Sequence, residues 1–169
     1  MEVDFDRLFA AMTEDLRSQL RARAIADPAM VGIYTGGAWV AERLHRQLAL
    51  ATPLGTLDIS FYRDDFSRIG MHPQVRPSKI EFNVDNRHII LVDDVLYTGR
   101  TVRAALNEVF DFGRPASVSL VVLVERDGRE LPIQAQVVGQ HLTLDPGQHI
   151  KLAGPDPLAL HIYDLENGA

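Results

Sequence analysis

Two short apolar runs, separated by an amphipathic segment, constrain the fold of this chain most strongly. Residues 88–93 (HIILVD) and 117–124 (SVSLVVLV) are almost continuously apolar, which is typical of strands buried on both faces. Between them, an apolar stripe recurs at helical spacing through Val102, Ala105, Leu106, Val109 and Phe110. Gly113 stands where a helix C-cap belongs. This strand–helix–strand order predicts a parallel sheet in an α/β fold.

The rest of the chain continues the alternation of helices and strands. Helical spacing predicts helices over residues 5–24 and 38–50. Further strands are expected over residues 30–35, 57–63, 80–84, 133–138 and 158–163. Residues 64–79 carry glycine, proline and acidic residues with little periodicity, which indicates a mobile loop. No repeat or linker divides the chain, so we expect one domain over residues 1–169.

Three polar clusters fall directly after predicted strands. They are Thr35-Gly36-Gly37, the segment from Asp93 to Thr101, and the segment from Glu125 to Arg129. In a parallel sheet the carboxyl ends of the strands meet at one edge, where ligands bind. We therefore expect the three clusters to form one site.

The segment from 93 to 101 combines two opposite chemical preferences. Gly99 allows successive backbone N–H groups to point at one anion, and the helix that begins near Thr101 adds its positive end. Thr98 and Thr101 offer hydroxyl donors. Asp93 and Asp94 accept hydrogen bonds from vicinal hydroxyls, or hold Mg²⁺ through water. A sugar phosphate such as a ribose 5-phosphate meets both preferences.

The same residue types also suit other sites. Paired aspartates at a strand end occur in phospho-acceptor receiver domains and aspartyl phosphatases, and threonine with glycine often caps a helix. Residue types and spacing alone thus leave three interpretations open: a sugar-phosphate site, another phosphate or metal site, and plain capping.

Composition narrows the class of protein further. The chain has 169 residues and no cysteine, which excludes disulfides and thiolate chemistry. Its net charge of -6 argues against indiscriminate nucleic-acid binding. The acidic, amphipathic N-terminus differs from a signal peptide, and we expect a cytoplasmic protein without membrane contact. Arg17, Arg21 and Arg23 on the first helix are interpreted as a solvated face rather than an RNA surface.

The string ILVDDVLYTGRTVRAAL at residues 90–106 resembles the 5-phosphoribosyl-1-pyrophosphate (PRPP) binding motif of type I phosphoribosyltransferases. Three further strings narrow the resemblance to the PyrR family of pyrimidine-operon attenuation proteins with uracil phosphoribosyltransferase activity. These are VGIYTGGAWVAERL (31–44), LDISFYRDD (57–65) and GRPASVSLVVLVERDGRELPI (113–133). The resemblance covers roughly residues 5–165.

This resemblance implies a type I phosphoribosyltransferase fold, in which helices flank a central, mostly parallel sheet. It also implies a small hood over the active site and a flexible loop that closes on substrate, for which residues 64–79 are the expected segment.

The resemblance also implies a role for each polar cluster. Asp93 and Asp94 would bind the ribose hydroxyls and, through water, Mg²⁺, with Asp64 and Asp65 near the metal. The 5-phosphate would be held by Leu96, Tyr97, Thr98, Gly99, Arg100 and Thr101. The base would be read by Arg126 and Arg129.

The leaving pyrophosphate would be met by Arg63 and by the backbone amides of Thr35, Gly36 and Gly37. Many members of the family carry Thr-Arg-Gly in this pyrophosphate loop, so Gly36 is a departure that removes a cation beside the leaving group.

The function that follows from the resemblance is transfer of phosphoribose from PRPP to uracil, which gives UMP and pyrophosphate with Mg²⁺ as cofactor. Two alternatives stay open. One is a nucleotide-sensing attenuator that binds the mRNA leader of pyrimidine genes with little catalysis, and the other is a purine phosphoribosyltransferase. A homo-oligomer is also expected.

Overall fold

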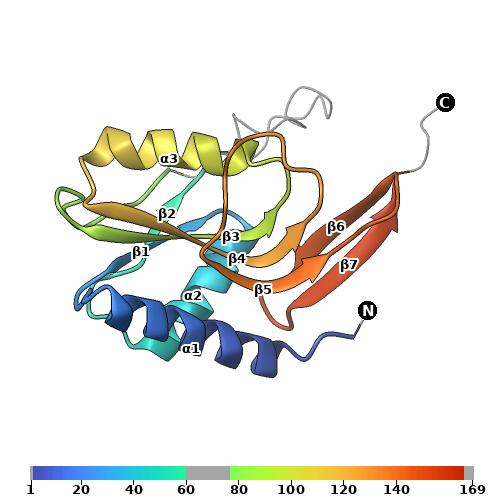
Figure 1. The fold of residues 1–169 in the computed structure, drawn as a ribbon, viewed down its shortest axis with the longest axis horizontal. Coiled ribbons are helices and arrows are strands. Elements are labelled where there is room, and N and C mark those ends of the chain that lie inside the picture. Colours follow the sequence, from blue (N-terminus) through green and yellow to red (C-terminus); the bar gives the residue numbers. More distant parts are fainter. Residues whose placement is uncertain (1, 60–76, 166–169) are drawn as a thin grey trace.

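The computed structural model describes residues 2–59 and 77–165. The helices are α1 (Phe5–Ala22), α2 (Gly36–Leu48) and α3 (Arg100–Phe112) (Figure 1). The strands are β1 (Ala29–Ile33), β2 (Gly55–Leu57), β3 (His88–Leu96), β4 (Ser117–Arg126), β5 (Val137–Leu142), β6 (Gln148–Ala153) and β7 (Ala159–Asp164).

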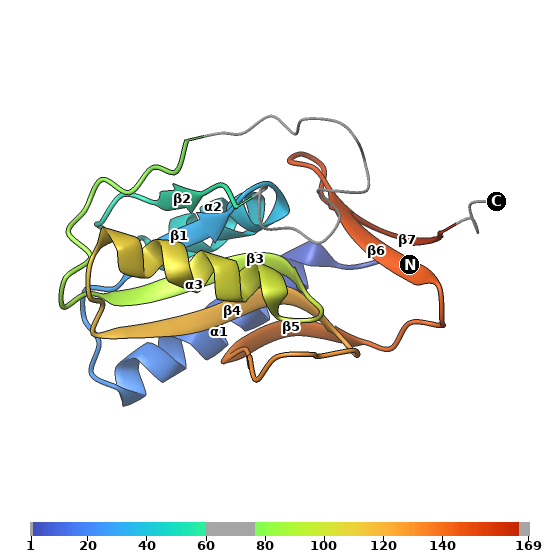
Figure 2. The same ribbon diagram turned by 90° about the horizontal axis from the view of Figure 1, so that it is seen from above.

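The main sheet has the order β2-β1-β3-β4-β5, and every neighbouring pair in it is parallel. The helices cover both faces, with α3 on one and α1 and α2 on the other (Figures 1 and 2). The predicted α/β fold with a parallel sheet is therefore confirmed.

Strand periodicity divides the core into two clusters, one on each face of the sheet. On β3, Ile90 and Val92 face the cluster that contains α1 and α2, whereas Ile89 and Leu91 face the cluster that contains α3. All four side chains are at most 1% exposed. A strand buried on both faces needs apolar residues at every position, which explains the continuous apolar run in the sequence.

The helices begin and end close to where the sequence predicts. Asp4 caps α1, because its side chain accepts a hydrogen bond from the N–H of Arg7 at 3.0 Å. Gly113 is the C-cap of α3 at φ 158°, as expected. No helix in the described residues is long and apolar enough to cross a membrane.

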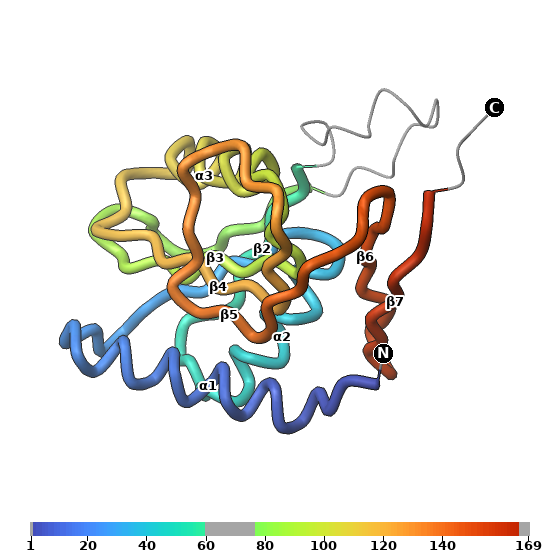
Figure 3. The backbone as a smooth tube through the Cα atoms, turned by 45° about the vertical axis from the view of Figure 1, so that its right-hand side comes forward, coloured from blue at the N-terminus to red at the C-terminus, as the bar shows by residue number. Residues whose placement is uncertain are grey.

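The hairpin β6–β7 is an antiparallel two-stranded sheet that stands apart from the main sheet, beyond the carboxyl ends of its strands (Figures 1 and 3). Its Leu152 and Leu160 join the core cluster of α1 and α2. The start of the chain runs beside the hairpin, where Val3 and Phe5 pack against the same cluster (Figure 3). The expected hood corresponds to this hairpin in position.

Several strand predictions were wrong in detail. The strand expected at 133–138 begins only at Val137, because the N–H of Ile133 bonds back to the carbonyl of Leu131 in a tight turn at 2.7 Å. The strand expected at 80–84 is not formed, and the nearest pairing is a single bridge between Thr56 and Lys79. The alternating side chains at 80–84 pack onto the core, with no strand partner among the described residues. Strand β6 was not predicted at all.

The strand expected at 57–63 was misplaced, because β2 spans Gly55–Leu57 and the described residues 58 and 59 are not in a strand. From residue 60 the prediction lies outside the described residues, as does the loop expected at 64–79 apart from residues 77–79.

Candidate functional site

The chain leaves the neighbouring strands β1 and β3 in opposite directions. From β1 it passes through α2 to the edge strand β2, and from β3 it passes through α3 to β4 on the other side. At such a switch point the connections after the two strands diverge, and ligands bind in the crevice outside their carboxyl ends. Two of the three polar clusters follow β1 and β3.

The N-terminus of α2 packs directly on the end of β3. A Cβ atom added to Gly36 would stand 2.7 Å from Cγ of Asp94, and one added to Gly37 would stand 2.8 Å from the carbonyl oxygen of Val92. Side chains at 36 and 37 would therefore force the helix away from the strand. Thr35 precedes the helix, and the Tyr34–Thr35 peptide bond is cis.

Asp93 and Asp94 are the last polar residues of β3, and they differ in burial. Asp93 is only 1% exposed, whereas Asp94 is half-buried. One oxygen of Asp93 accepts the N–H of Asp94 at 2.9 Å, and one oxygen of Asp94 accepts the N–H of Val95 at 2.9 Å. These bonds hold both carboxylates beside the N-terminus of α2, whose positive end favours negative charge.

The β3–α3 loop (residues 97–99) has the conformation of an anion-binding turn. Gly99 lies in the left-handed region at φ 95° and is followed at once by the first residue of α3. Among the described residues, the N–H groups of Thr98 and Gly99 make no hydrogen bond, while the Thr98 hydroxyl oxygen accepts the N–H of Arg100 at 3.2 Å. Successive unpaired N–H groups at a helix N-terminus form an anion site.

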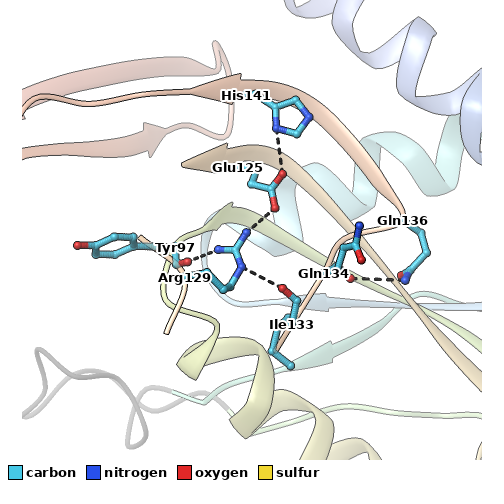
Figure 4. A network of polar contacts seen from close by, with 7 residues as sticks. All are labelled: Tyr97, Glu125, Arg129, Ile133, Gln134, Gln136 and His141. Atoms are coloured by element: carbon cyan, nitrogen blue, oxygen red, sulfur yellow. Dashed lines mark hydrogen bonds and ion pairs between the residues drawn. The ribbon is translucent and has the colours of Figure 1, made fainter. Parts of the chain in front are cut away.

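The β4–β5 loop (residues 127–136) is tied to this turn by Arg129, as Figure 4 shows. The Arg129 guanidinium donates to the carbonyl of Tyr97, to the carbonyl of Ile133 at 2.9 Å and to Glu125. On the other side of Glu125, its second oxygen lies 2.9 Å from Nδ1 of His141. The third polar cluster therefore lies beside the second, as the sequence predicts.

Arg126, the last residue of β4, connects three parts of the site. Its guanidinium lies 3.9 Å from the centre of the Tyr97 ring, and its Nη1 donates to the carbonyl of Gln148 in β6 at 3.2 Å. Its Nε is buried with no partner among the described residues. A cavity of about 350 Å³ opens beside it, lined by Glu125, Arg126, Asp127, Gly128, Arg129, His141, Leu142 and Thr143.

The remaining predicted residues are placed as follows. The side chain of Leu96 is buried in the core, so only its backbone can face a ligand. Arg100 pairs with Glu130 through a contact of 2.8 Å. Thr101 lies in the first turn of α3 and is partly exposed. Arg63, Asp64 and Asp65 lie outside the described residues.

Sequence reasoning placed Glu125 in the third polar cluster but missed the contribution of His141. Parallel pairing sets Glu125 opposite His141 in the β4–β5 register. The two residues are far apart in the chain, and no periodicity marks the pairing, so only the sheet register brings them together. The only local signal was the i, i+4 spacing of Glu125 and Arg129.

Asp93 and Asp94 can hold a divalent cation only if water or a substrate supplies its remaining ligands. The described residues contain no group of three or more acidic, histidine or cysteine side chains able to hold a metal. Asp93 and Asp94 do supply two adjacent carboxylates at the carboxyl end of β3. Mg²⁺ commonly binds through one or two carboxylates together with water and substrate phosphates, which this pair suits.

Comparison with known proteins agrees with this geometry. The family model described as phosphoribosyl transferase domain matches residues 6–152. Bifunctional protein PyrR from Nitrosococcus oceani is 61% identical over 168 residues, which cover 98% of this chain and 95% of the relative. Bifunctional protein PyrR from Pseudomonas aeruginosa is 60% identical over 153 residues, which cover 90% of each chain.

Solved structures support the same fold. A hypoxanthine-guanine phosphoribosyltransferase from Bacillus anthracis superposes with a TM-score of 0.68 at 17% identity, covering 88% of this chain and 85% of the other. A hypoxanthine phosphoribosyltransferase from Staphylococcus aureus gives 0.62 at 19% identity, covering 81% and 74%. At these identities the similarity concerns the fold alone.

Proposed function

The chain belongs to the phosphoribosyl transferase domain family and, within it, to the PyrR proteins, and on that premise we propose that it makes UMP and pyrophosphate from uracil and PRPP. It also regulates pyrimidine biosynthesis genes in response to UMP. A purine as the accepted base is the alternative that the assay below tests.

One observation carries this proposal. The end of β3 presents two carboxylates, and the turn that follows it presents the N–H groups of Thr98 and Gly99, which bond to no other residue in the described part of the chain. A ligand that satisfies both needs hydroxyls at one end and a phosphate at the other. The ribose 5-phosphate part of PRPP has this arrangement.

The residues around the ribose have distinct tasks. Asp93 and Asp94 accept hydrogen bonds from its 2- and 3-hydroxyls. The N–H groups of Thr98 and Gly99, together with the hydroxyl of Thr101, donate to the 5-phosphate at the N-terminus of α3. These contacts fix C1 of the ribose relative to the incoming base, which is the positioning part of catalysis.

The pyrophosphate group would lie against the N-terminus of α2. Glycine at both 36 and 37 supports this role, because neither residue has a side chain of its own that could cover the N–H groups of the first helical turn. Arg63 is proposed as the cation that meets the pyrophosphate. Mg²⁺, held through water by Asp93 and Asp94, supplies charge neutralisation on the departing pyrophosphate when it is bound.

In the reaction, N1 of uracil loses its proton to water or to the departing pyrophosphate and forms a bond to C1 of the ribose, as the bond from C1 to the pyrophosphate oxygen breaks. Positive charge develops on the sugar ring, and the carboxylates of Asp93 and Asp94 lie on its hydroxyl side. The base lies against the β4–β5 loop, where Arg126 and Arg129 are the residues expected to read uracil.

A base-selection assay tests the proposal. The protein is incubated with Mg²⁺ and PRPP and with uracil, hypoxanthine, guanine or adenine in turn, and nucleotide products are separated by chromatography. We expect UMP from uracil and no purine nucleotide. A purine product without UMP would establish the alternative. Absence of any product, together with tight UMP binding, would mean that the protein senses UMP without catalysing the transfer.

The regulatory role has its own measurement. We propose that the protein binds the mRNA leader of a pyrimidine operon in the cytoplasm, as a homo-oligomer. A gel shift with that leader, with and without UMP, is expected to show UMP-dependent binding, and sedimentation of the same sample gives the oligomeric state. A leader that fails to shift at low salt with UMP present would contradict the RNA role.

A further inference from the structure

Two consecutive carbonyl groups of the β3–α3 loop, those of Tyr97 and Thr98, are held by the β4–β5 loop. The carbonyl of Tyr97 accepts from the guanidinium of Arg129. The next carbonyl, that of Thr98, accepts the N–H groups of Glu130 at 3.0 Å and Leu131 at 3.1 Å. Three consecutive residues of the β4–β5 loop thus bind two consecutive peptide groups of the β3–α3 loop.

Peptide geometry converts these bonds into a direction for the N–H groups. In a planar trans peptide, the C=O and the N–H of the next residue point in opposite directions. The cis peptide bonds among the described residues lie elsewhere in the chain. Because Arg129 holds the Tyr97 carbonyl, the N–H of Thr98 points to the opposite side, where it makes no hydrogen bond to a described residue. The Thr98 carbonyl is held by the N–H groups of Glu130 and Leu131, so the N–H of Gly99 also points away from the β4–β5 loop.

Arg129 is itself held in a defined orientation. Its Nε donates to the carbonyl of Ile133 at 2.9 Å, and Nη2 pairs with Glu125 (Figure 4). The Glu125 side chain is 21% exposed and is contacted from its other side by His141. A planar guanidinium can serve three acceptors in fixed directions, which a single ammonium group cannot do.

We propose that Arg129 is a positioning residue for the 5-phosphate, acting through the Tyr97 carbonyl rather than by contact with the base. This proposal rests on the proposed function, since it takes the β3–α3 loop as the phosphate site. It changes the task expected of Arg129, whose guanidinium donates to protein acceptors from all three of its nitrogens. Base recognition then falls to Arg126 and to backbone groups of the loop.

A consequence is that the two ends of the nucleotide site are mechanically connected. The loop that lies beside the base also sets the direction of the N–H groups that bind the phosphate. Loss of the Arg129 guanidinium frees the Tyr97–Thr98 peptide to rotate, so that the N–H of Thr98 no longer points steadily at the anion. Loss of Arg129 is therefore expected to weaken binding of the phosphate end of the ligand, although residue 129 lies in the loop assigned to the base.

Ribose 5-phosphate is the probe, because it carries the phosphate and lacks the base. Its dissociation constant is measured by calorimetry on the full chain for the unaltered protein, Arg129→Gln and Arg103→Gln. Arg103 is an exposed cation in the first turn of α3 whose side chain makes no hydrogen bond or ion pair with a described residue, so it controls for loss of one positive charge. We expect Arg129→Gln to weaken binding about tenfold or more, as for loss of an oriented donor to a charged group, and Arg103→Gln to weaken it less than threefold.

Steady-state kinetics with uracil separates positioning from base reading. Arg129→Gln is expected to raise the KM for PRPP while the KM for uracil stays within twofold. A raised KM for uracil with unchanged ribose 5-phosphate binding would overturn the proposal and restore the base-reading role. If the unaltered protein does not bind ribose 5-phosphate, the phosphate site itself is refuted and the inference fails with it.

A second variant covers the case in which Arg129→Gln does not fold. Glu125→Gln keeps the shape of the side chain and removes the charge that holds Nη2 of Arg129. We expect it to weaken ribose 5-phosphate binding in the same direction with an unchanged melting temperature within the error of the measurement. Binding equal to that of the unaltered protein would overturn the proposal.

Discussion

Gly36 lies so close to Asp94 that residue 36 has no room for a side chain. A Cβ atom there would stand 2.7 Å from Cγ and 3.0 Å from Cβ of Asp94. Rotation of the carboxylate alone cannot relieve the second contact, because Cβ is attached to the backbone of β3. Glycine at position 36 therefore allows direct packing of α2 on the acidic pair.

Gly36→Ala is expected to lower kcat/KM for PRPP by about tenfold to a hundredfold, because the added methyl group displaces either Asp94 or the N-terminus of α2. The measurement is initial-rate kinetics with uracil held at saturation. Gly147→Ala is the control for an added methyl group with no described atom within 4 Å. Because Gly147 has φ 87°, alanine there strains the backbone, so the melting temperatures of both variants are measured beside the kinetics. Equal kcat/KM in Gly36→Ala and the unaltered protein would show that the close contact relaxes without functional cost.

Asp93→Asn and Asp94→Asn are each expected to lower PRPP turnover by about a hundredfold, and together to abolish it, because both carboxylates position the ribose. Their effects on stability should differ. Asp93 is 1% exposed and accepts a backbone N–H, so its substitution is expected to lower the free energy of unfolding by about 1–3 kcal/mol. The half-buried Asp94 is expected to change it by less than about 1 kcal/mol.

Urea unfolding and PRPP turnover on the same preparations check this difference. Asp111→Asn, which removes an exposed carboxylate from the last turn of α3, is the control for a change of net charge. Undiminished turnover in the Asp93 and Asp94 double variant would remove both residues from the ribose site.

Arg126→Gln is expected to loosen the β6–β7 hairpin. The arginine stacks on Tyr97 and donates to the carbonyl of Gln148, so it is a direct link between the main sheet and the hairpin. Loss of the stacking and of the hydrogen bond is expected to cost about 1–2 kcal/mol locally. Hydrogen exchange of the amides in residues 148–153 should quicken about tenfold, while those of β3 stay protected. Unchanged exchange in the hairpin would mean that its apolar contacts alone hold it.

RNA binding by this acidic chain is expected to depend strongly on salt. A complex with about six phosphate contacts loses roughly two to three orders of magnitude in affinity between 50 and 200 mM salt. We expect Arg17→Gln plus Arg21→Gln to leave the salt dependence unchanged. Both guanidinium groups lie near Glu14, at 3.7 and 4.0 Å, and Arg17 also donates to the carbonyl of Gln47 at 2.8 Å, so both have partners within the chain. A smaller slope of log affinity against log salt in this variant would place α1 on the RNA.

Local patterns predicted much of the fold and of the site. Some features depend only on contacts or dihedral angles within a few residues. These are the apolar runs of β3 and β4, the apolar stripe of α3 and the glycine at 113. The acidic pair and the glycine-containing turn at 97–99 were also visible, because carboxylates, hydroxyls and left-handed glycine have the same chemistry in any fold. Strand limits near 133–142 were misplaced, since the turn there depends on hydrogen bonds that β-propensity does not describe.

By itself, the sequence determined the order of the elements, the parallel sheet and the residue types available for a phosphate and a diol. Only the tertiary structure decided that Gly36 meets Asp94 and that Arg129 holds the carbonyl of Tyr97. Both relationships depend on the strand order β2-β1-β3-β4-β5 and on its register. Contacts between residues so far apart in the chain cannot be predicted from periodicity, because periodicity describes only neighbouring residues and these partners meet only when the sheet forms.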